Sequence, residues 1–197
     1  MRIVDQYLTG LRQALPPAPR QRLAGAAGAS VEQLQSLLQA FPHCPASLLA
    51  LLTQVNGTHW DDDDDVDTAV PVLGADEAMG GFPYFLRSVE QILEDRAMYP
   101  ESIEDTYGDL SGDDFLTLDS RIDRHASGAE RLCFANCMNN GGTSMLYLDF
   151  APGPGGVAGQ VIRFLHDPDE YRVIAAGFDD YLQLQIHQEY DFVDPDQ

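Results

Sequence analysis

Three apolar runs in the last third of the chain lie so close together that only tight turns can join them. They read RLCFANCM (131–138), SMLYLDFAP (144–152) and GQVIRFLHD (159–167), and the links between them contain NNGGT and PGPGG. Such Asn-Gly and Pro-Gly links form turns, and PGPGG cannot be helical. Links this short join antiparallel neighbours, because parallel strands need a crossover of about a dozen residues or more. We therefore predict two adjacent antiparallel hairpins.

The rest of the chain is mostly helical in its spacing of apolar residues. We expect helices over residues 3–15, from 31 to 41 with Ser30 as N-cap, through 48–55 with Ser47 as N-cap, from Phe85 to Arg96, and near the C-terminus around Phe178, Tyr181 and Leu182. Shorter apolar runs predict strands at AVPVLG (69–74) and FLTLDSRI (115–122), and a short strand or turn just before the closing helix. The stretch APRQRLAGAAGAS is expected to be loose or weakly helical.

This order of elements predicts an α+β fold, with an antiparallel or mixed β-sheet and helices packed on it. A chain of 197 residues with 44% hydrophobic content suits one domain. We place an N-terminal helical extension at 1–29, the domain at 30–190 and a frayed tail at 191–197. No apolar stretch approaches the roughly 20 residues that span a bilayer, and the N-terminus lacks a signal-peptide pattern, so we expect a cytoplasmic protein.

Three cysteines give no even disulfide framework. Cys133 and Cys137 occupy one predicted strand, where a spacing of four would place both on the same face. Buried free thiols are the ordinary explanation for such positions. No CxxC or HxxxH pattern supplies the further ligands that a metal site would need.

The charge of the chain is strongly negative and unevenly placed. The net charge is -21, and every one of the cations is arginine, which suggests a GC-rich bacterial genome. Residues 1–60 contain four arginines and two acids, a net of +2, so the remainder carries -23. Such a surface repels nucleic acids and anionic membranes. It would attract a basic protein and speed its encounter with this chain.

An aspartate run, HWDDDDDVDTAVP, contributes much of this charge through Asp61, Asp62, Asp63, Asp64, Asp65 and Asp67. With Asp61 at position 1, a calcium-binding EF-hand loop would need Gly at position 6 and Glu at position 12. The chain has Val66 and Val72 there, so the EF-hand pattern fails. A solvated loop, weak cation binding and a docking site for a cationic partner all remain as interpretations.

No pattern predicts catalysis or a cofactor. The histidines are scattered, and carboxylates are abundant without any pair being singled out. His166-Asp167 could orient an imidazole, although a surface histidine explains it equally well. The chain has no G-x-S-x-G elbow, and PGPGG precedes a predicted strand rather than the helix of a phosphate loop. In GGFPYFL, Tyr84 beside Pro83 either anchors the core or faces a partner.

Four short stretches together resemble the SUKH superfamily, which includes yeast cell-wall-synthesis regulators and bacterial immunity proteins. The resemblance spans about residues 31–186. The matching residues are Asn56, Gly57, Trp60, Leu73, Gly74, Pro83, Tyr84, Leu148, Asp149, Pro152, Gly155, Gly156, Gly159, Gln160, Val161, Phe178 and Leu182.

The resemblance implies an α+β fold without catalysis, in which these residues form turns and core. It also implies a protein-binding module, in many bacterial members an immunity protein that blocks a toxin. We expect Asp149 to brace backbone amides of the turn that follows it. Combining the resemblance with the charge, we hypothesise that Asp61–Asp65 and Asp67 border a surface for a basic toxin, with Tyr84 as a further contact. A regulatory scaffold and a metal-dependent enzyme using the acidic cluster are the competing hypotheses.

Overall fold

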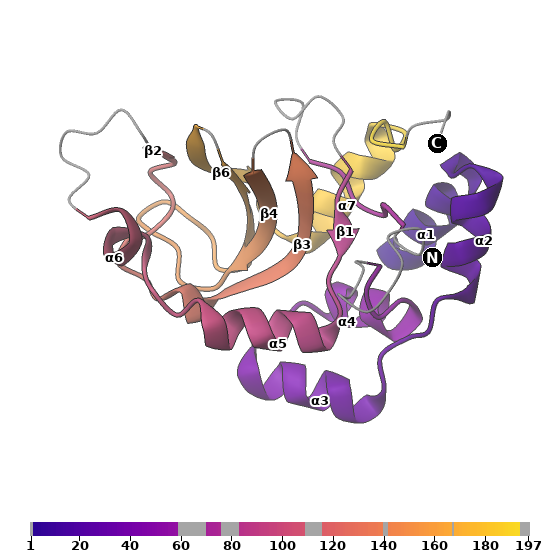
Figure 1. The fold of residues 1–197 in the computed structure, drawn as a ribbon, viewed down its shortest axis with the longest axis horizontal. Helices are drawn as coiled ribbons and strands as arrows, with labels where there is room; N and C mark the ends of the chain where they lie inside the picture. Colours follow the sequence, from indigo (N-terminus) through magenta and orange to yellow (C-terminus); the bar gives the residue numbers. More distant parts are fainter. Residues whose placement is uncertain are drawn as a thin grey trace.

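The computed structural model describes residues 2–58, 70–75, 83–108, 116–139, 142–166 and 168–193. They form a six-stranded sheet covered by helices, the α+β architecture predicted from the sequence (Figure 1). The aspartate run and Trp60 lie outside the described residues. No helix in the described ranges is long and apolar enough to cross a bilayer.

The sheet has the strand order β1-β3-β4-β5-β6-β2. Its strands are β1 (Phe85–Leu86), β2 (Leu116–Leu118), β3 (Arg131–Asn139), β4 (Gly142–Asp149), β5 (Gln160–Leu165) and β6 (Asp169–Ala175). Only β2 and β6 pair in parallel, so the sheet is mixed. The two predicted hairpins, β3–β4 and β4–β5, are confirmed and occupy the centre of the sheet. By contrast, the predicted strand at AVPVLG is reduced to a single bridge between Leu73 and Tyr84.

In the described part of the chain, four helices precede the first strand: α1 (Ile3–Ala14), α2 (Pro17–Gly25), α3 (Val31–Ala40) and α4 (Ala46–Gln54). The cap predicted at Ser30 is confirmed, since its hydroxyl accepts a hydrogen bond from the Gln33 amide and the Gln33 side chain accepts one from the Ser30 amide. The cap predicted at Ser47 is wrong. Helix α4 begins two residues earlier than expected, at Ala46 after Pro45, and has no side-chain cap.

The remaining helices are α5 (Val89–Met98), α6 (Ile103–Tyr107), a short 3-10 helix (Gly128–Glu130) and α7 (Phe178–His187). The helix expected from Phe85 therefore begins four residues later. Ser88 is its N-cap and forms a capping box with Gln91. Phe85 and Leu86, which have apolar side chains consistent with either structure, pair with β3 instead.

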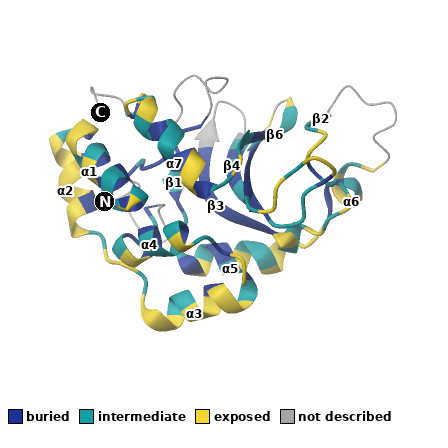
Figure 2. Cartoon of the chain, turned by 180° about the vertical axis from the view of Figure 1, so that it is seen from behind, coloured by how far each residue is buried: buried dark blue, intermediate teal, exposed yellow. Residues whose placement is uncertain are grey.

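The main core lies between one face of the sheet and helices α1, α4 and α7. In Figure 2 the central strands are largely buried, whereas the outer faces of α2 and α3 are exposed. Leu146 and Leu148 of β4 point into this core, and both are fully buried. Each buried leucine contributes roughly 1.5–3 kcal/mol relative to an exposed one. A smaller cluster around Ile103, Ile162 and Val173 covers the opposite face.

A β-bulge in β3 corrects the prediction that Cys133 and Cys137 share one face. The pairing with β4 shifts between Cys133 and Ala135, so that Phe134 is an extra residue in β3. An extra residue reverses the alternation of side chains beyond it. Cys133 pairs with Tyr147, on the face opposite the main core, whereas Cys137 pairs with Ser144 and joins the main core. All three cysteines are buried free thiols.

The two ends of the chain are bound together inside the main core. The Tyr7 hydroxyl donates to the Val72 carbonyl at 2.7 Å, and the Tyr190 hydroxyl donates to the Tyr7 carbonyl at 3.0 Å. The two rings contact each other, with centroids 5.4 Å apart. Phe192 is also buried, so the expected fraying at 191–197 is wrong for that residue; residues 194–197 lie outside the described part.

Candidate functional site

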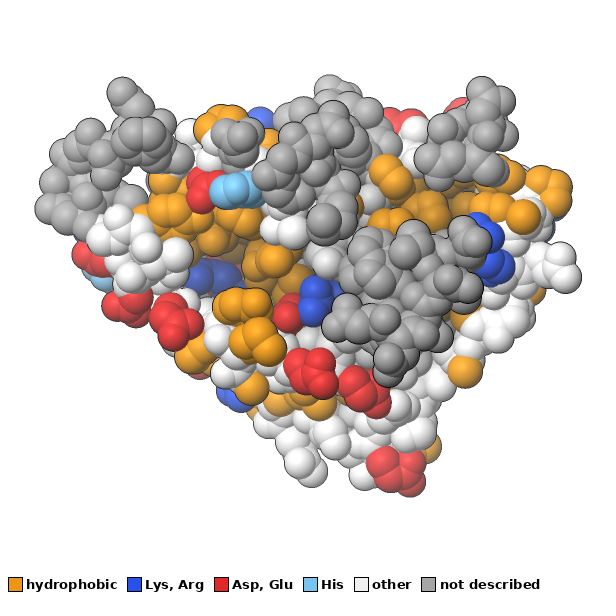
Figure 3. Space-filling view, in the orientation of Figure 1, with side chains coloured by type: hydrophobic (Ala, Val, Ile, Leu, Met, Phe, Trp, Pro, Cys, Tyr) orange, Lys and Arg blue, Asp and Glu red, His pale blue; other side chains and the backbone are white. Residues whose placement is uncertain are grey.

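A pocket of about 270 Å³ opens on the face of the sheet opposite the main core. Figure 3 shows it as a hollow with many hydrophobic side chains, between α6 and the C-terminal end of α5. Most of its lining is aromatic or otherwise apolar and comes from both helices and strands β4, β5 and β6. We call it the tyrosine pocket, after its principal lining residues: Tyr99, Tyr107, Met145, Tyr147, Phe164 and Tyr171.

The alternation of β4 explains why these side chains gather here. In the run MLYLD, Met145 and Tyr147 share one face of the strand, and the leucines between and beside them take the other. Register then aligns the neighbouring strand, since Phe164 of β5 pairs with Met145. Tyr171 of β6 pairs with Phe164 on its other side. Three strands thus contribute a continuous apolar surface.

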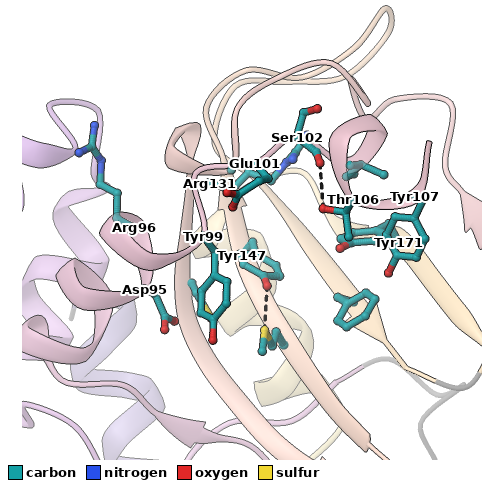
Figure 4. A pocket seen from close by; sticks show the side chains of 15 residues that line it. Asp95, Arg96, Tyr99, Glu101, Ser102, Thr106, Tyr107, Arg131, Tyr147 and Tyr171 are labelled. Atoms are coloured by element: carbon teal, nitrogen blue, oxygen red, sulfur yellow. Dashed lines mark hydrogen bonds between the residues drawn. The ribbon is translucent and has the colours of Figure 1, made fainter. Parts of the chain in front are cut away.

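The aromatic rings form a connected wall. The centroids of Phe164 and Tyr171 are 4.6 Å apart, and Tyr107 of α6 meets Tyr171 edge-on at 6.5 Å. Tyr147 lies between Tyr99 on one side and Tyr107 with Tyr171 on the other (Figure 4). Its hydroxyl contacts the Met145 sulfur at 2.8 Å. Tyr99, at the mouth of the pocket, is 60% exposed, as is its neighbour Met98 at 64%.

Burial keeps two tyrosine hydroxyls and one cysteine thiol of the pocket protonated. It raises the pKa of Tyr147 well above its ordinary value, and it is the largest cause of the raised pKa of Tyr107. Burial likewise raises the pKa of the Cys133 thiol. At neutral pH these groups are therefore protonated, which leaves the phenols without charge and the thiol a poor nucleophile. These three groups therefore present neutral surface to the pocket.

Two arginines contribute to the lining, but both guanidinium groups are engaged elsewhere. Arg96 points away from the tyrosines in Figure 4, and its guanidinium carbon lies 5.3 Å from the centre of the Phe41 ring. Arg131 donates to the Asp123 carbonyl at 2.6 Å and lies 3.8 Å from the Asp149 carboxylate. The Nε atom of each of these two side chains is buried without a hydrogen-bond partner.

Two carboxylates, those of Asp95 and Glu101, line the pocket, and Asp169 lies next to its Tyr107. Asp95 forms an ion pair with Arg87 at 2.7 Å. Asp169 accepts a hydrogen bond from the Tyr107 hydroxyl and lies 2.6 Å from the His166 ring nitrogen. The imidazole predicted to be oriented by Asp167 thus contacts Asp169, while Asp167 itself is outside the described residues. Among described residues, no group of three or more His, Cys, Asp or Glu could hold a metal ion.

Tyr84, expected either in the core or facing a partner, is fully buried. Its hydroxyl lies 2.5 Å from the Ser144 hydroxyl, which in turn donates to the Phe164 carbonyl at 2.5 Å. A side chain enclosed in this way cannot contact a partner, so the partner-facing alternative is wrong and the core alternative describes it. Pro83, next to it, is half-buried.

The Asn56-Gly57 pair follows α4 and contacts the N-terminal end of α5. The Asn56 side-chain oxygen accepts from the Val89 amide at 2.9 Å and so supplements the N-cap of α5. Gly57 has a φ of +88°, and a Cβ there would lie 2.8 Å from the Ser88 nitrogen. The position consequently requires glycine on both counts. The carbonyl of Gly74, another of the residues that match the family, accepts a hydrogen bond from the Tyr181 hydroxyl at 2.6 Å.

The β4–β5 turn shows the bracing predicted for Asp149. Its carboxylate accepts from the Ala151 amide at 3.2 Å and from the Gln160 side chain at 3.0 Å. Gly155 and Gly159 have φ of +82° and +88°, so these turn positions favour glycine. A Cβ on Gly156 would lie 2.5 Å from the Arg121 carbonyl. These motif residues hold the turn together and lie outside the tyrosine pocket's lining.

Sequence reasoning missed the tyrosine pocket. The period-two pattern of SMLYLDF could have placed Met145 and Tyr147 on a common face. Tyr99, Tyr107 and Tyr171 are far apart in the sequence, and only the packing of α5 and α6 beside the sheet brings them together.

Comparison with known proteins gives a family but no individual relative. No curated protein matches the chain. A match to the SMI1 / KNR4 family (SUKH-1) covers residues 28–184, from just before α3 into α7. The chain therefore belongs to the SMI1 / KNR4 family (SUKH-1).

Proposed function

We propose that this chain is a non-catalytic protein-binding module, acting as an immunity protein that binds and neutralises a basic bacterial toxin. The observation that carries the proposal is the tyrosine pocket. Tyrosine is enriched at protein interfaces because its ring supplies apolar area while its hydroxyl tolerates water. Here exposed Met98 and Tyr99 extend the pocket's surface outward, where a partner can reach them.

The net charge of -21 supports a cationic partner. Toxins that cut nucleic acids have basic surfaces that hold phosphate. An acidic protein placed on such a surface would exclude the substrate, and attraction between the charges would speed capture. The proposal keeps Asp61–Asp65 and Asp67 as residues that accelerate association, with the tyrosine pocket as the place where the bound partner is held.

The test examines the genes beside this one for a toxin, purifies the toxin domain that they encode, and measures binding by calorimetry with toxin activity in parallel. Tyr99→Ala should weaken binding by at least about fivefold, as expected for an interface anchor. Val31→Ala is the matched control, because Val31 is 65% exposed on α3, away from the pocket. Absence of binding, or a neighbouring gene that encodes no toxin, would favour the regulatory-scaffold alternative.

Asn substitutions at Asp61–Asp65 and Asp67 address the role of charge separately. They should lower the association rate and flatten its dependence on salt, with a smaller effect on dissociation. An unchanged association rate would remove these aspartates from the proposal.

A further inference from the structure

We propose that the exposed segment 98–101, between α5 and α6, enters a recess on the partner protein that has an apolar floor and a rim of arginine or lysine. The inference rests on the proposed function and adds the chemistry of the partner's surface. It is argued from the exposed apolar side chains of the segment, from the contacts that fix its backbone and from the unbalanced carboxylates beside it.

Two adjacent side chains of the segment are large, apolar and exposed. Met98 is the last residue of α5 and Tyr99 is its C-cap, and they are 64% and 60% exposed. Pro100, also exposed, follows the end of the helix and cannot donate a backbone hydrogen bond to extend it. Single exposed apolar side chains are common, whereas contiguous apolar surface marks a site of interaction.

The backbone of the segment is held by the loop before β3. The Ser127 hydroxyl donates to the Pro100 carbonyl at 2.7 Å, and the Gly128 amide donates to the carbonyls of Pro100 and Glu101, each at 3.1 Å. The fit is close, since a Cβ on Gly128 would lie 2.2 Å from the Tyr99 carbonyl oxygen. A segment that is ordered before binding loses little conformational entropy when a partner contacts it. These contacts therefore present the two apolar side chains in a fixed position.

Three exposed carboxylates lie beside the segment. Glu94 is one helical turn before Met98, on the same face of α5, and Glu101 ends the segment. Glu130 is two residues after Gly128. Figure 3 shows acidic side chains on both sides of the hydrophobic surface at this end of α5. In the described part of the chain, which includes every arginine, no arginine forms an ion pair with any of these three carboxylates.

The arginines nearest to the segment have other partners within the chain. Arg124 pairs with Glu104 at 3.4 Å. The Arg131 side chain is only 5% exposed, and the Arg96 guanidinium lies 5.3 Å from the centre of the Phe41 ring and points away from the tyrosines (Figure 4). None of them is placed to neutralise the exposed carboxylates beside the segment.

The local charge argues for a cationic rim on the partner. Segments 94–107 and 123–131 together contain seven carboxylates and three arginines, a net of -4. Opposite charge at the edge of an interface speeds encounter and fixes the register of the two proteins, whereas like charge is unfavourable. Contacts that exclude water from a central tyrosine supply most of the affinity. A recess with an apolar floor and basic residues around it meets both requirements.

The first experiment removes the three charges and measures binding of the toxin domain by calorimetry. The rim variant combines Glu94→Gln, Glu101→Gln and Glu130→Gln. Because all three side chains are exposed, these changes leave the core intact.

A control variant changes the net charge by the same amount on the opposite face of the sheet. It alters three exposed carboxylates on and after α7, which covers the main core: Asp179→Asn, Glu189→Gln and Asp191→Asn. The rim variant should weaken toxin binding at least about fivefold more than the control variant. Equal weakening by the two variants would overturn the inference while the immunity role stands, because the toxin domain would still bind.

The second experiment does not depend on the toxin. Nuclear magnetic resonance follows the Met98 methyl signal, identified by its loss in Met98→Leu, while the full chain is titrated with N-acetyl-Lys-Leu-Lys-Leu-Lys amide. This peptide should shift the signal saturably, and N-acetyl-Lys-Ser-Lys-Ser-Lys amide, which has the same charge, should bind at least about threefold more weakly. The rim variant should bind the leucine peptide at least about fivefold more weakly than the control variant does.

The two experiments distinguish failure of this inference from failure of the proposed function. If the leucine peptide gives no saturable shift at Met98, or binds no better than the serine peptide, the inference is overturned whatever the toxin domain does. If the leucine peptide binds as expected but the toxin domain does not bind at all, the immunity role is overturned while the chemistry inferred for the 98–101 segment is supported.

Discussion

Replacing Ser144 with alanine should destabilise the fold more than replacing Tyr84 with phenylalanine, although each change removes one hydroxyl group. The Ser144 hydroxyl has a single proton, and it donates that proton to the Phe164 carbonyl. Tyr84 must therefore be the donor in its 2.5 Å contact with Ser144. The two hydroxyls form a directed chain, from Tyr84 to Ser144 to the backbone of β5.

The direction of the chain sets the expected energies. Tyr84→Phe removes a donor and leaves Ser144 still bonded to Phe164, so it should cost about 1 kcal/mol. Ser144→Ala removes the acceptor of the fully buried Tyr84 hydroxyl. Its remaining polar neighbours are the Cys137 thiol, a weak acceptor, and the Arg163 guanidinium, which has no acceptor atom, so the change should cost about 2–3 kcal/mol. The double variant no longer contains the stranded hydroxyl. It should cost about 2 kcal/mol, less than the sum of the single changes.

Urea unfolding followed by far-ultraviolet circular dichroism gives the three free energies of unfolding. A coupling of at least about 1 kcal/mol between the two positions is expected. Additive costs, or a larger cost for Tyr84→Phe than for Ser144→Ala, would refute the assigned direction of the hydrogen bonds.

Three other predictions follow from local geometry. Gly57→Ala should lower the free energy of unfolding by about 2 kcal/mol or more in urea titrations, because its φ is +88° and the new methyl group meets Ser88. Hydrogen bonds from Arg121 lower the pKa of Asp119 to about 2. The stability that this carboxylate contributes is therefore present above its unfolded pKa of about 3.9 and is lost as pH falls toward about 2. Asp119→Asn should flatten that part of an acid-unfolding profile. Stability should also fall as pH rises above about 10, where phenols ionise in the unfolded chain first. Tyrosinate absorbance should appear together with unfolding for the buried phenols Tyr7, Tyr84 and Tyr181.

The parts of the fold that depend on neighbouring residues could be predicted from the sequence. The hairpins β3–β4 and β4–β5 follow from short turn-forming links between apolar runs, and the cap at Ser30 follows from a Gln three residues later. The bracing of the turn by Asp149 is equally local, since its partner Ala151 is two residues away. Each of these needs only the chemistry of a few adjacent side chains.

The parts that depend on distant packing could not be predicted. The stretch RLCFANCM does not indicate that Phe134 is an extra residue, because the bulge depends on how β3 pairs with β4. Phe85 and Leu86 suit a helix as well as a strand, and the choice is made by the edge of β3 that they join. The tyrosine pocket has the same origin. Its lining residues come from seven separate elements, and their meeting is a property of the tertiary structure.

The linked tyrosines at the two ends of the chain have a consequence for anyone who trims the protein. The family match runs from 28 to 184, yet Tyr7 and Tyr190 lie outside both limits and close on each other and on Val72. A fragment cut at those limits would lose all of α1 and the last residues of α7. The other leucines of the main core, which Leu8 and Leu11 of α1 help to cover, would then be exposed to water. The segment that the family match covers is thus shorter than the segment that is needed to shield the main core from water.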